Sequence, residues 1–432
     1  MPIDLTTHES EVLHDARLFE RITIDELGKK IEGELKARQA IFNFACISLV
    51  RNKDGTNNLL VNAESRTGKD FVTKRVTQIF PPNIVESLNS ASPRTFTYWH
   101  ANEKVEINGI EQEFSWDGKI CRITDMPNAL LKSESFKTFL SDEEKSVIVN
   151  KNKQGANAAC EYSVKGKPIF IGTTASANPK KEMLNRFCII NLDESNDQTQ
   201  AIIRRKLEEA SGKRPFNRSY SITSTAALSK LKKVFVEIPF ADDLLPHLPD
   251  DELRMRSDTD LILNLIKANA ALYQYQREKK DGKVLATPQD YEIARQSLKQ
   301  IHTGRQANLT RGRQRVLETA TSWCEANPDK RFSVQDIRQY KPFISERKYY
   351  WHLDWLAENG YLSLKHEIRG QNEQGKGGRE VAVYRVFRHN YDGLELPPFT
   401  ELGVQSVQSN QSNHSGQSVQ KGGKTGLSEH FE

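Results

Sequence analysis

The sequence predicts an α/β fold with a parallel sheet, followed by a helical lid and a small C-terminal module of helices and two strands. Over residues 41–215, short apolar runs alternate with helical stretches, as strands and helices do in a parallel sheet. Residues 216–305 are mostly helical, with apolar side chains at helical spacing, namely Leu261, Leu265, Ala268 and Leu272. Residues 306–390 hold three helical stretches and then two strand-like runs.

Five segments follow from this pattern, because 432 residues is long for a single domain. Residues 1–40 are predicted to form a charged helical segment, which precedes the α/β core at residues 41–215. The lid at 216–305 and the module at 306–390 come next. Residues 391–432 are rich in Gln, Ser, Asn and Gly, have little to bury, and are expected to be disordered.

Composition argues against several classes of protein. The apolar runs are too short to cross a membrane, and the N-terminus lacks the pattern of a secretory signal. The five cysteines never form a CxxC pair, which favours free thiols in the cytoplasm over disulfides or zinc. Residues 306–390 hold 15 Lys/Arg against 10 Asp/Glu, a surplus equal to the net charge of the whole chain, +5. A charge surplus in one segment is expected for a nucleic-acid contact.

The stretch LLVNAESRTGKDF, residues 59–71, has the outline of a phosphate loop: a strand, a tight loop with Gly-Lys, and a helix. Backbone N–H groups at a helix N-terminus and a lysine bind phosphate oxygens, so we expect ATP with Mg²⁺ here. Two positions depart from the pattern: Ala63 replaces the first glycine, and Asp70 replaces the Ser/Thr that ligates Mg²⁺. The predicted nucleotide-binding residues are Ala63, Glu64, Ser65, Arg66, Thr67, Gly68, Lys69 and Asp70.

Three further residues follow in the order in which ATPases with a phosphate loop carry an acid, a polar residue and an arginine along the chain. Asp125 ends the strand-like run KICRIT, where an acid can hold Mg²⁺ and activate water, so Asp70 and Asp125 are the predicted metal ligands. Asn178 follows the run PIFIGTT, where it can position the attacking water. Arg186 comes eight residues later and can reach the γ-phosphate of a neighbouring subunit. Each residue also fits a plain structural role, but the order of all of them favours the catalytic interpretation.

TASANP and LNRFCIINLDESNDQT resemble the sensor and finger region of minichromosome-maintenance helicases, which are AAA+ ATPases of the P-loop NTPase class. MRSDTDLILNLIKANAALYQYQ followed by VLATPQDYEIARQSL resembles their helical lid. SPRTFTYWH and the LDESxxQT element also look like helicase-like ATPases of plasmids and viruses. The resemblance covers roughly residues 55–300. It implies Lys69 on phosphate, Asp125 on Mg²⁺ and water, Asn178 as sensor one, Arg186 as a finger in trans, and Arg254 or Arg256 as sensor two.

A basic hairpin is predicted between the acid and the sensor. Two β-prone runs flank Lys151-Asn152-Lys153-Gln154-Gly155, and in a ring helicase such a hairpin grips DNA phosphates through Lys151 and Lys153. An exposed solvated hairpin is the alternative. A second hairpin is expected to turn at Asn108-Gly109, and its acidic content argues against phosphate contact.

The last module predicts a winged helix-turn-helix. Ser333 caps a short helix and Ser345 opens a longer one, which is expected to expose Arg347, Lys348 and His352 to the major groove. The wing is expected to bring Arg369, Lys376 and Arg379 toward phosphates. Winged helices also serve as protein-interaction modules, so docking of a partner is an alternative.

The sequence thus predicts a cytoplasmic ATPase that forms a ring, expected to be a hexamer, and moves on single- or double-stranded DNA, in replication of a mobile element or virus. The finger in trans implies the oligomer. Because Ala63, Asp70 and Thr124 depart from the usual motifs, the first alternative is a DNA-binding initiator or regulator that ATP only switches. The second is an ATPase module docked to a primase or polymerase through its winged helix.

Overall fold

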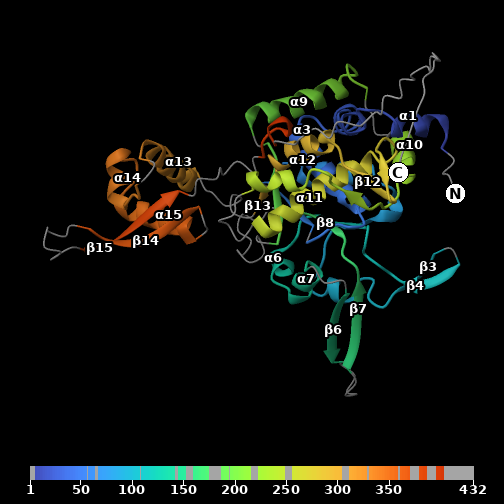
Figure 1. Ribbon diagram of the computed structural model, residues 1–432, viewed down its shortest axis with the longest axis horizontal. Helices are drawn as coiled ribbons and strands as arrows, with labels where there is room; N and C mark the ends of the chain where they lie inside the picture. Colours follow the sequence, from blue (N-terminus) through green and yellow to red (C-terminus); the bar gives the residue numbers. More distant parts are fainter. Residues whose placement is uncertain are drawn as a thin grey trace, which may run out of the picture.

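The structure of the protein is a computed structural model, drawn in Figure 1. It describes residues 5–55, 57–63, 67–107, 109–141, 145–151, 159–174, 186–193, 195–215, 222–248, 255–303, 311–327, 330–358, 361–369, 379–386 and 396–402. Within these ranges no helix is long and apolar enough to cross a membrane.

Six strands form the central sheet, in the order β13-β9-β1-β8-β5-β2. All are parallel except the short β13, which pairs antiparallel with β9 at one edge. Their bounds are β1 Asn58–Asn62, β2 Val85–Leu88, β5 Ile120–Ile123, β8 Ile169–Thr174, β9 Cys188–Asn191 and β13 His302–Thr303. The α/β fold with a parallel sheet, predicted for residues 41–215, is confirmed.

Strand β8 separates β1 from β5, so the strands that precede the phosphate loop and Asp125 both border it. Thr173 of β8 pairs with Val61, and Gly172 pairs with Ile123. Because the three strands are parallel, their carboxyl ends lie at one edge, where open α/β sheets bind ligands. The residues that follow β1, β5 and β8 therefore lie close together at this edge.

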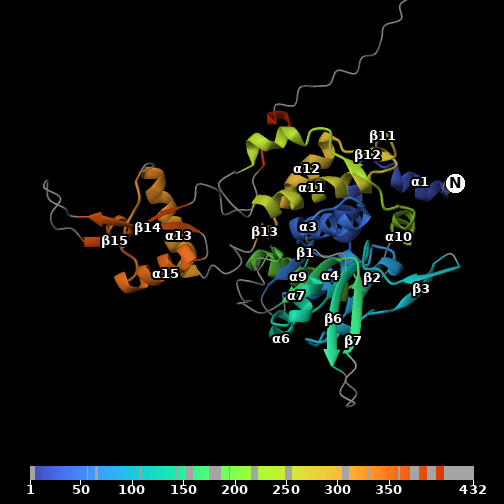
Figure 2. The ribbon, with the colours of Figure 1, turned by 60° about the horizontal axis from the view of Figure 1, so that its bottom comes forward.

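Alternate residues of the strands pack into two clusters, as the two-residue period of a strand requires. Leu59 and Val61 join the larger cluster, and Leu60 joins the smaller one, which surrounds the fully buried Trp116. Figure 2 shows α11 and α12 above α3, and the sheet beneath them. The helices have the bounds α3 Leu35–Cys46, α4 Lys69–Thr77, α9 Asn196–Ala210, α11 Met255–Leu272 and α12 Pro288–Leu298.

The segment at residues 1–40 and the lid at 216–305 share one hydrophobic cluster with the sheet. Val12 and Ile22 are fully buried in it, and α3 runs across position 40. In α11, the predicted helical spacing is confirmed, because Leu261, Leu265, Ala268 and Leu272 are all buried. The other elements of these segments are α1 Thr7–Leu13, α2 Leu18–Glu20, the π-helix Arg21–Glu26, α10 Ile222–Ser229, β10 Val236–Glu237, β11 Lys279–Lys280 and β12 Lys283–Leu285.

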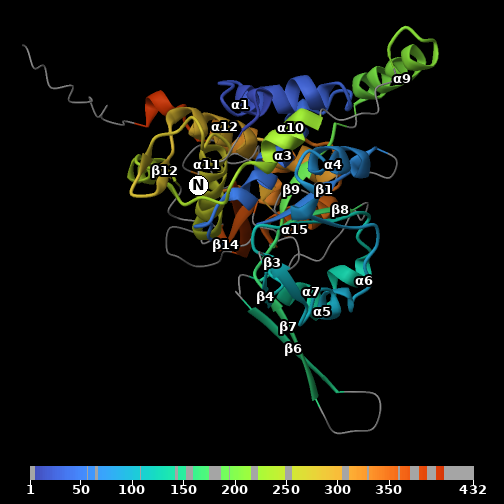
Figure 3. The same cartoon turned by 90° about the vertical axis from the view of Figure 1, so that its right-hand side faces the viewer.

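The smaller cluster holds the helices α5 Thr95–Tyr98, α6 Asn128–Leu131 and α7 Glu134–Phe139. Two antiparallel hairpins extend from this side of the core (Figure 3). Hairpin β3–β4 pairs Lys104–Ile107 with Ile110–Glu113, as predicted for a turn at Asn108-Gly109. Hairpin β6–β7 pairs Lys145–Lys151 with Ala159–Lys165. The paired strands of both predicted hairpins are confirmed, and the predicted basic tip at residues 152–155 lies outside the described residues.

Three helices and a hairpin form the C-terminal module, residues 311–386, which has its own hydrophobic cluster. The bounds are α13 Arg311–Ala326, α14 Val334–Tyr340, α15 Glu346–Glu358, β14 Leu362–Arg369 and β15 Arg379–Val386. Ser333 caps α14 in a capping box with Asp336, as its position in the sequence suggested. Tyr349, Leu353 and Leu356 of α15 are fully buried.

After this module the chain returns to the core, which corrects the prediction that residues 391–432 form a disordered tail. Leu396 and Leu402 are buried in the larger cluster, and Phe399 packs at 5.0 Å from the ring of Phe240. The Tyr291 hydroxyl donates to the carbonyl of Pro397 at 2.6 Å. The apolar side chains of LPPFTEL, three residues apart, supply the burial that the polar residues after them lack. Residues 403–432 lie outside the described residues.

Candidate nucleotide site

The phosphate loop has the predicted strand–turn–helix form. Strand β1 ends at Asn62, and α4 begins at Lys69 after Gly68, whose φ of 89° favours glycine. The Lys69 side chain is buried, with 5 % of its surface exposed. Ala63 is buried and does not adopt a positive φ, so its backbone does not require the glycine usual at this position. Glu64, Ser65 and Arg66 lie outside the described residues.

One buried hydroxyl joins the two predicted metal ligands. The Thr173 hydroxyl, at the end of β8, donates to the carboxylate of Asp70. The same oxygen accepts the backbone N–H of Asp125 at 2.8 Å. Asp70 is at the start of α4 and Asp125 follows β5, so β8 brings them together at the carboxyl edge of the sheet. The structure thus brings together the two aspartates that the sequence predicted as metal ligands.

Asp125 has a strained backbone and an exposed side chain. Its φ is 48°, in the left-handed region that few residues other than glycine adopt, although aspartate tolerates it better than most. The bonds that its own N–H and that of Met126 make to Thr173 hold this conformation. Strain of this kind costs on the order of 1–3 kcal/mol and is concentrated at functional sites.

Arg122 is a residue of this site that the sequence analysis missed. It lies in the middle of β5 with 5 % of its surface exposed, and its Nε donates to the Ser87 hydroxyl at 3.3 Å. Burial lowers the pKa of the Arg122 guanidinium, and the charge of Asp70 opposes that shift. Its Nη1 is buried without a hydrogen-bond partner among the described residues. A charged residue within an otherwise apolar central strand was the available signal.

Arg122 and Thr173 explain how an aspartate is tolerated in this loop. A carboxylate beside phosphate adds repulsion, and the buried guanidinium of Arg122 offsets it. The described residues include no group of three or more His, Cys, Asp or Glu that could hold a metal. Mg²⁺ commonly takes only one or two carboxylates together with phosphate oxygens, so Asp70 and Asp125 fit that smaller requirement.

A pocket of about 650 Å³ opens beside Thr67 and Gly68. Its apolar lining includes Phe71, whose side chain is 46 % exposed and carries the Arg75 guanidinium 5.1 Å from the ring centre. Val72 of α4 also lines it, and the rest comes from the segment before α3 and from α9, namely Lys30, Ile31, Glu32, Glu34, Gln198, Ile202, Arg205, Lys206 and Glu209. Sequence reasoning missed this pocket, because its residues come from three separate segments.

Charged groups of both signs line the pocket. Burial raises the pKa of Glu34 to about 7, although its carboxylate accepts the N–H of Asp193. Burial also lowers the pKa of Lys30, and Arg75 and Arg205 add to that effect. Glu32 forms ion pairs with Arg205 at 3.4 Å and with Arg214 at 3.1 Å. An apolar wall with donors and acceptors around it suits a planar heterocycle.

Arg186 lies at the amino ends of the parallel strands, whereas the phosphate loop lies at their carboxyl ends. It comes just before β9, and its carbonyl accepts the Asn58 side-chain N–H at 3.1 Å, level with the start of β1. At ~3.3 Å per residue, the five residues of β1 place Arg186 about 15 Å from the loop that follows Asn62. Arg186 is therefore not brought together with Lys69 within one chain. Asn178 lies outside the described residues.

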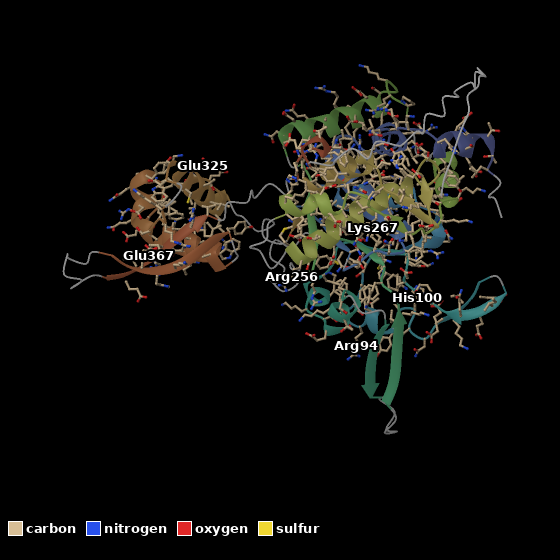
Figure 4. The ribbon with its side chains drawn as sticks, in the orientation of Figure 1. Arg94, His100, Arg256, Lys267, Glu325 and Glu367 are labelled. Atoms are coloured by element: carbon tan, nitrogen blue, oxygen red, sulfur yellow. The ribbon has the colours of Figure 1, made fainter. Side chains whose placement is uncertain are left out.

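Arg256 is exposed at the start of α11 (Figure 4) and is also not brought to the phosphate loop. One turn later, the Asp260 carboxylate packs against Gly55, where an added Cβ would lie 3.0 Å from it. Asn264 donates to the carbonyl of Asp54 at 2.6 Å. These contacts place this part of α11 beside the chain that enters β1. Arg254 lies outside the described residues.

The predicted DNA contacts have different outcomes. Lys151 is the last residue of β6, and Lys153 lies outside the described residues. Arg347 and Lys348 are exposed on α15, as expected. Arg369 and Arg379 are backbone partners where β14 ends and β15 begins, and Lys376 lies outside the described residues.

The prediction that His352 is exposed is wrong, since only 8 % of its surface is accessible. Position 352 comes three residues after the buried Tyr349 and four before the buried Leu356, so it shares the inward face of α15. Burial lowers the pKa of His352, and the charges of Arg313 and Lys348 lower it further. His352 is therefore a packing residue of the module.

Comparison with models of protein families finds no match for this chain, and comparison with curated proteins finds none either.

Proposed function

We propose that the chain is a DNA-acting ATPase of the AAA+ type whose catalytic site is completed by a neighbouring copy. The observation that carries the proposal is the link through Thr173, which joins Asp70 and Asp125 beside Lys69. The strand order supports it, because β8 lies between β1, which precedes the phosphate loop, and β5, which precedes Asp125. The resemblance of residues 55–300 to minichromosome-maintenance helicases agrees with this arrangement.

Each residue of the site has a distinct part in the proposal. Backbone N–H groups at the start of α4 and the Lys69 ammonium bind the phosphates, and the pocket beside Phe71 takes the base. Asp125 and Asp70 would hold the magnesium ion, and Asp125 would accept a proton from the attacking water. Bound Mg²⁺ supplies neutralisation of the charge that develops on the transferred phosphoryl group. Asn178 orients the water.

The positions of Arg186 and Arg256 support an oligomer. Both lie away from the phosphate loop of their own chain, on the side where β1 begins. An arginine finger supplied in trans accounts for this placement, because it reaches the γ-phosphate of the next subunit. A closed ring of identical chains repeats this head-to-tail contact, and a hexamer is the ring that the resemblance implies.

DNA is the proposed substrate of the ring. Hairpin β6–β7, with Lys151 and Lys153, contacts phosphates in the channel. The C-terminal module acts as a winged helix that brings Arg347, Lys348, Arg369, Lys376 and Arg379 to DNA, and its segment carries the charge surplus of the chain. The proposed setting is cytoplasmic replication of a mobile element or virus, with a primase or polymerase as a further partner.

One observation favours the second candidate, a DNA-binding initiator that ATP switches without turnover. The Asp70 carboxylate already accepts the Thr173 hydroxyl and faces Arg122, so Asp70 is less free to hold a metal than the usual serine or threonine. Under this alternative, ATP binding persists but hydrolysis is absent.

Mixing two inactive variants tests the shared site. Lys69→Ala removes phosphate binding, and Arg186→Ala removes the finger while ATP still binds. If the finger acts in trans, a mixture of the two recovers turnover that neither shows alone, because some interfaces combine an intact Lys69 with an intact Arg186. A mixture that stays inactive overturns the proposal, and so does wild-type activity in Arg186→Ala alone.

A further inference from the structure

One face of α15 presents aromatic rings to solvent. Trp351 is 59 % exposed and Tyr350 is 43 % exposed, and Arg347 lies one turn before Trp351 on the same helix. All five tryptophans of the chain are among the described residues, and Trp351 is the one that is exposed. We name Arg347, Tyr350 and Trp351, together with Arg313 beside them, the Trp351 face. Rings this exposed, close together, mark a contact surface.

The Trp351 ring is held in place before any partner binds. The Arg313 guanidinium of α13 lies 4.9 Å from the centre of the Trp351 ring and 3.8 Å from that of Trp355. The ring of the buried His352 lies 4.9 Å from the Trp351 ring and is tilted by 56° to it. A ring fixed by its neighbours loses little conformational entropy on binding, so such a surface binds more tightly than a mobile one.

Charge on α15 does not favour a role as a simple phosphate-binding helix. It carries Glu346, Asp354 and Glu358 against Arg347 and Lys348, so acidic residues outnumber basic ones. Glu346 pairs with Arg338 at 2.6 Å, and Asp354 accepts the Tyr384 hydroxyl at 2.5 Å. The positive charge beside the rings comes from Arg313 of α13 and Arg347 of α15, whereas the Arg315 guanidinium lies 4.3 Å from the centre of the Phe343 ring.

Aromatic rings flanked by arginines are the arrangement that binds unpaired nucleic-acid strands. Bases stack on the rings, whereas arginines hold the backbone that runs beside them. In a duplex the bases are already stacked on one another, so a flat exposed tryptophan contributes little there. Arg313 and Arg347 beside the exposed rings are placed to meet a phosphate backbone.

We propose that the Trp351 face is a stacking platform for unpaired bases of single-stranded DNA. The proposal rests on the proposed function in that it specifies which form of DNA the C-terminal module takes. Trp351 and Tyr350 stack the bases, and Arg313 and Arg347 contact the phosphates beside them. The module then holds the separated strand rather than the duplex.

The test measures binding of the full chain to three probes of equal length, about 20 nucleotides. These are oligothymidylate, a backbone of the same length without bases, and a duplex. Trp351→Ala is expected to weaken oligothymidylate binding about tenfold, within the range for loss of one stacked base, and to leave the other two probes unchanged. Trp351→Phe should restore most of the affinity, and Arg313→Ala should weaken both single-stranded probes.

Tyr340→Ala is the matched control, because Tyr340 is 43 % exposed in the same module but lies on α14. Oligothymidylate should also quench the fluorescence of wild type more than that of Trp351→Ala. The proposal is overturned if Trp351→Ala leaves oligothymidylate binding unchanged, as a protein-docking surface would, or if it weakens duplex and single strand equally. ATP hydrolysis is measured in parallel, so its absence alongside the expected binding pattern rejects the proposed function and not the platform.

Discussion

Asp70 is the residue whose chemistry most affects the proposed catalytic site. It takes the place of the neutral hydroxyl that is usual in a phosphate loop, and the structure surrounds it with two compensating groups. The Thr173 hydroxyl donates to its carboxylate, and the buried Arg122 supplies a positive charge close by. Asp70 and Arg122 are therefore coupled, and we expect the free-energy effects of substitutions at the two positions not to be additive.

Arg122→Met is expected to weaken nucleotide binding by about tenfold, which corresponds to about 1.4 kcal/mol. The reason is that the negative charge of Asp70 then faces the phosphates without compensation. Adding Asp70→Ser to the same chain should recover most of the loss. Titration with a fluorescent ATP analogue gives the affinities, and Arg94→Met, at an exposed arginine (Figure 4), is the control. Equal affinity in wild type and Arg122→Met would show that the charges are not coupled.

Glu34 gives the folded state a pH dependence. Burial raises its pKa to about 7 from the ordinary 4.5, so the folded chain keeps a proton that the unfolded chain has lost. Its contribution to stability is therefore largest below pH 4.5 and falls as the pH rises to about 7. Glu34→Gln removes this titration, and we expect its unfolding temperature to exceed that of wild type by more at about pH 8 than at about pH 4.

Thermal unfolding followed by circular dichroism at both pH values measures the effect. Glu113→Gln, at an exposed glutamate of β4, should show no such difference. If the gap between Glu34→Gln and wild type does not change with pH, Glu34 has an ordinary pKa in the folded chain.

At the scale of single residues, the sequence predicted those that follow a strand and missed those that depend on distant contacts. Lys69, Asp70 and Asp125 are recognisable because a phosphate loop and a strand-end acid have local patterns. Arg122 is buried because β5 pairs with β8 on one side and β2 on the other, and a single charged residue in a short apolar run was the only local sign of it. The prediction that His352 is exposed was wrong, because the inward face of α15 is set by how this helix packs in the module.

Among the elements, the helices and strands with clear periodicity were predicted well. The alternation of buried side chains in β1 and the helical spacing in α11 are both local properties of the sequence. The short β2 and the turn Phe399–Glu401 were not predicted, because few residues carry the signal. The same turn shows that the module at 311–386 is bounded on both sides by parts of the core.

Removing the returning segment should destabilise the core. A chain that ends at residue 395 loses the buried Leu396 and Leu402 and the ring contact of Phe399 with Phe240. Burying a leucine stabilises a fold by about 1.5–3 kcal/mol, so we expect the unfolding temperature to fall by several degrees. A chain that ends at residue 405 is the matched control. Equal unfolding temperatures for the two would mean that the segment adds nothing to the fold.

For the whole molecule, the arrangement of groups matters more than any single residue. Lys69, Asp70 and Asp125 lie at the carboxyl ends of the strands, and Arg186 lies at their amino ends, which is the arrangement that the proposed site shared between subunits requires. The sequence predicted the order of these residues along the chain. It could not show which edge each one occupies, because that depends on how β1, β8 and β9 pair.

Steady-state ATP hydrolysis by the full chain, with and without single-stranded DNA, tests the central claim most directly. The expected result is turnover that single-stranded DNA stimulates and that Lys69→Ala abolishes. ATP that binds without being hydrolysed under every DNA condition would contradict it, and would leave a DNA-binding protein that ATP switches.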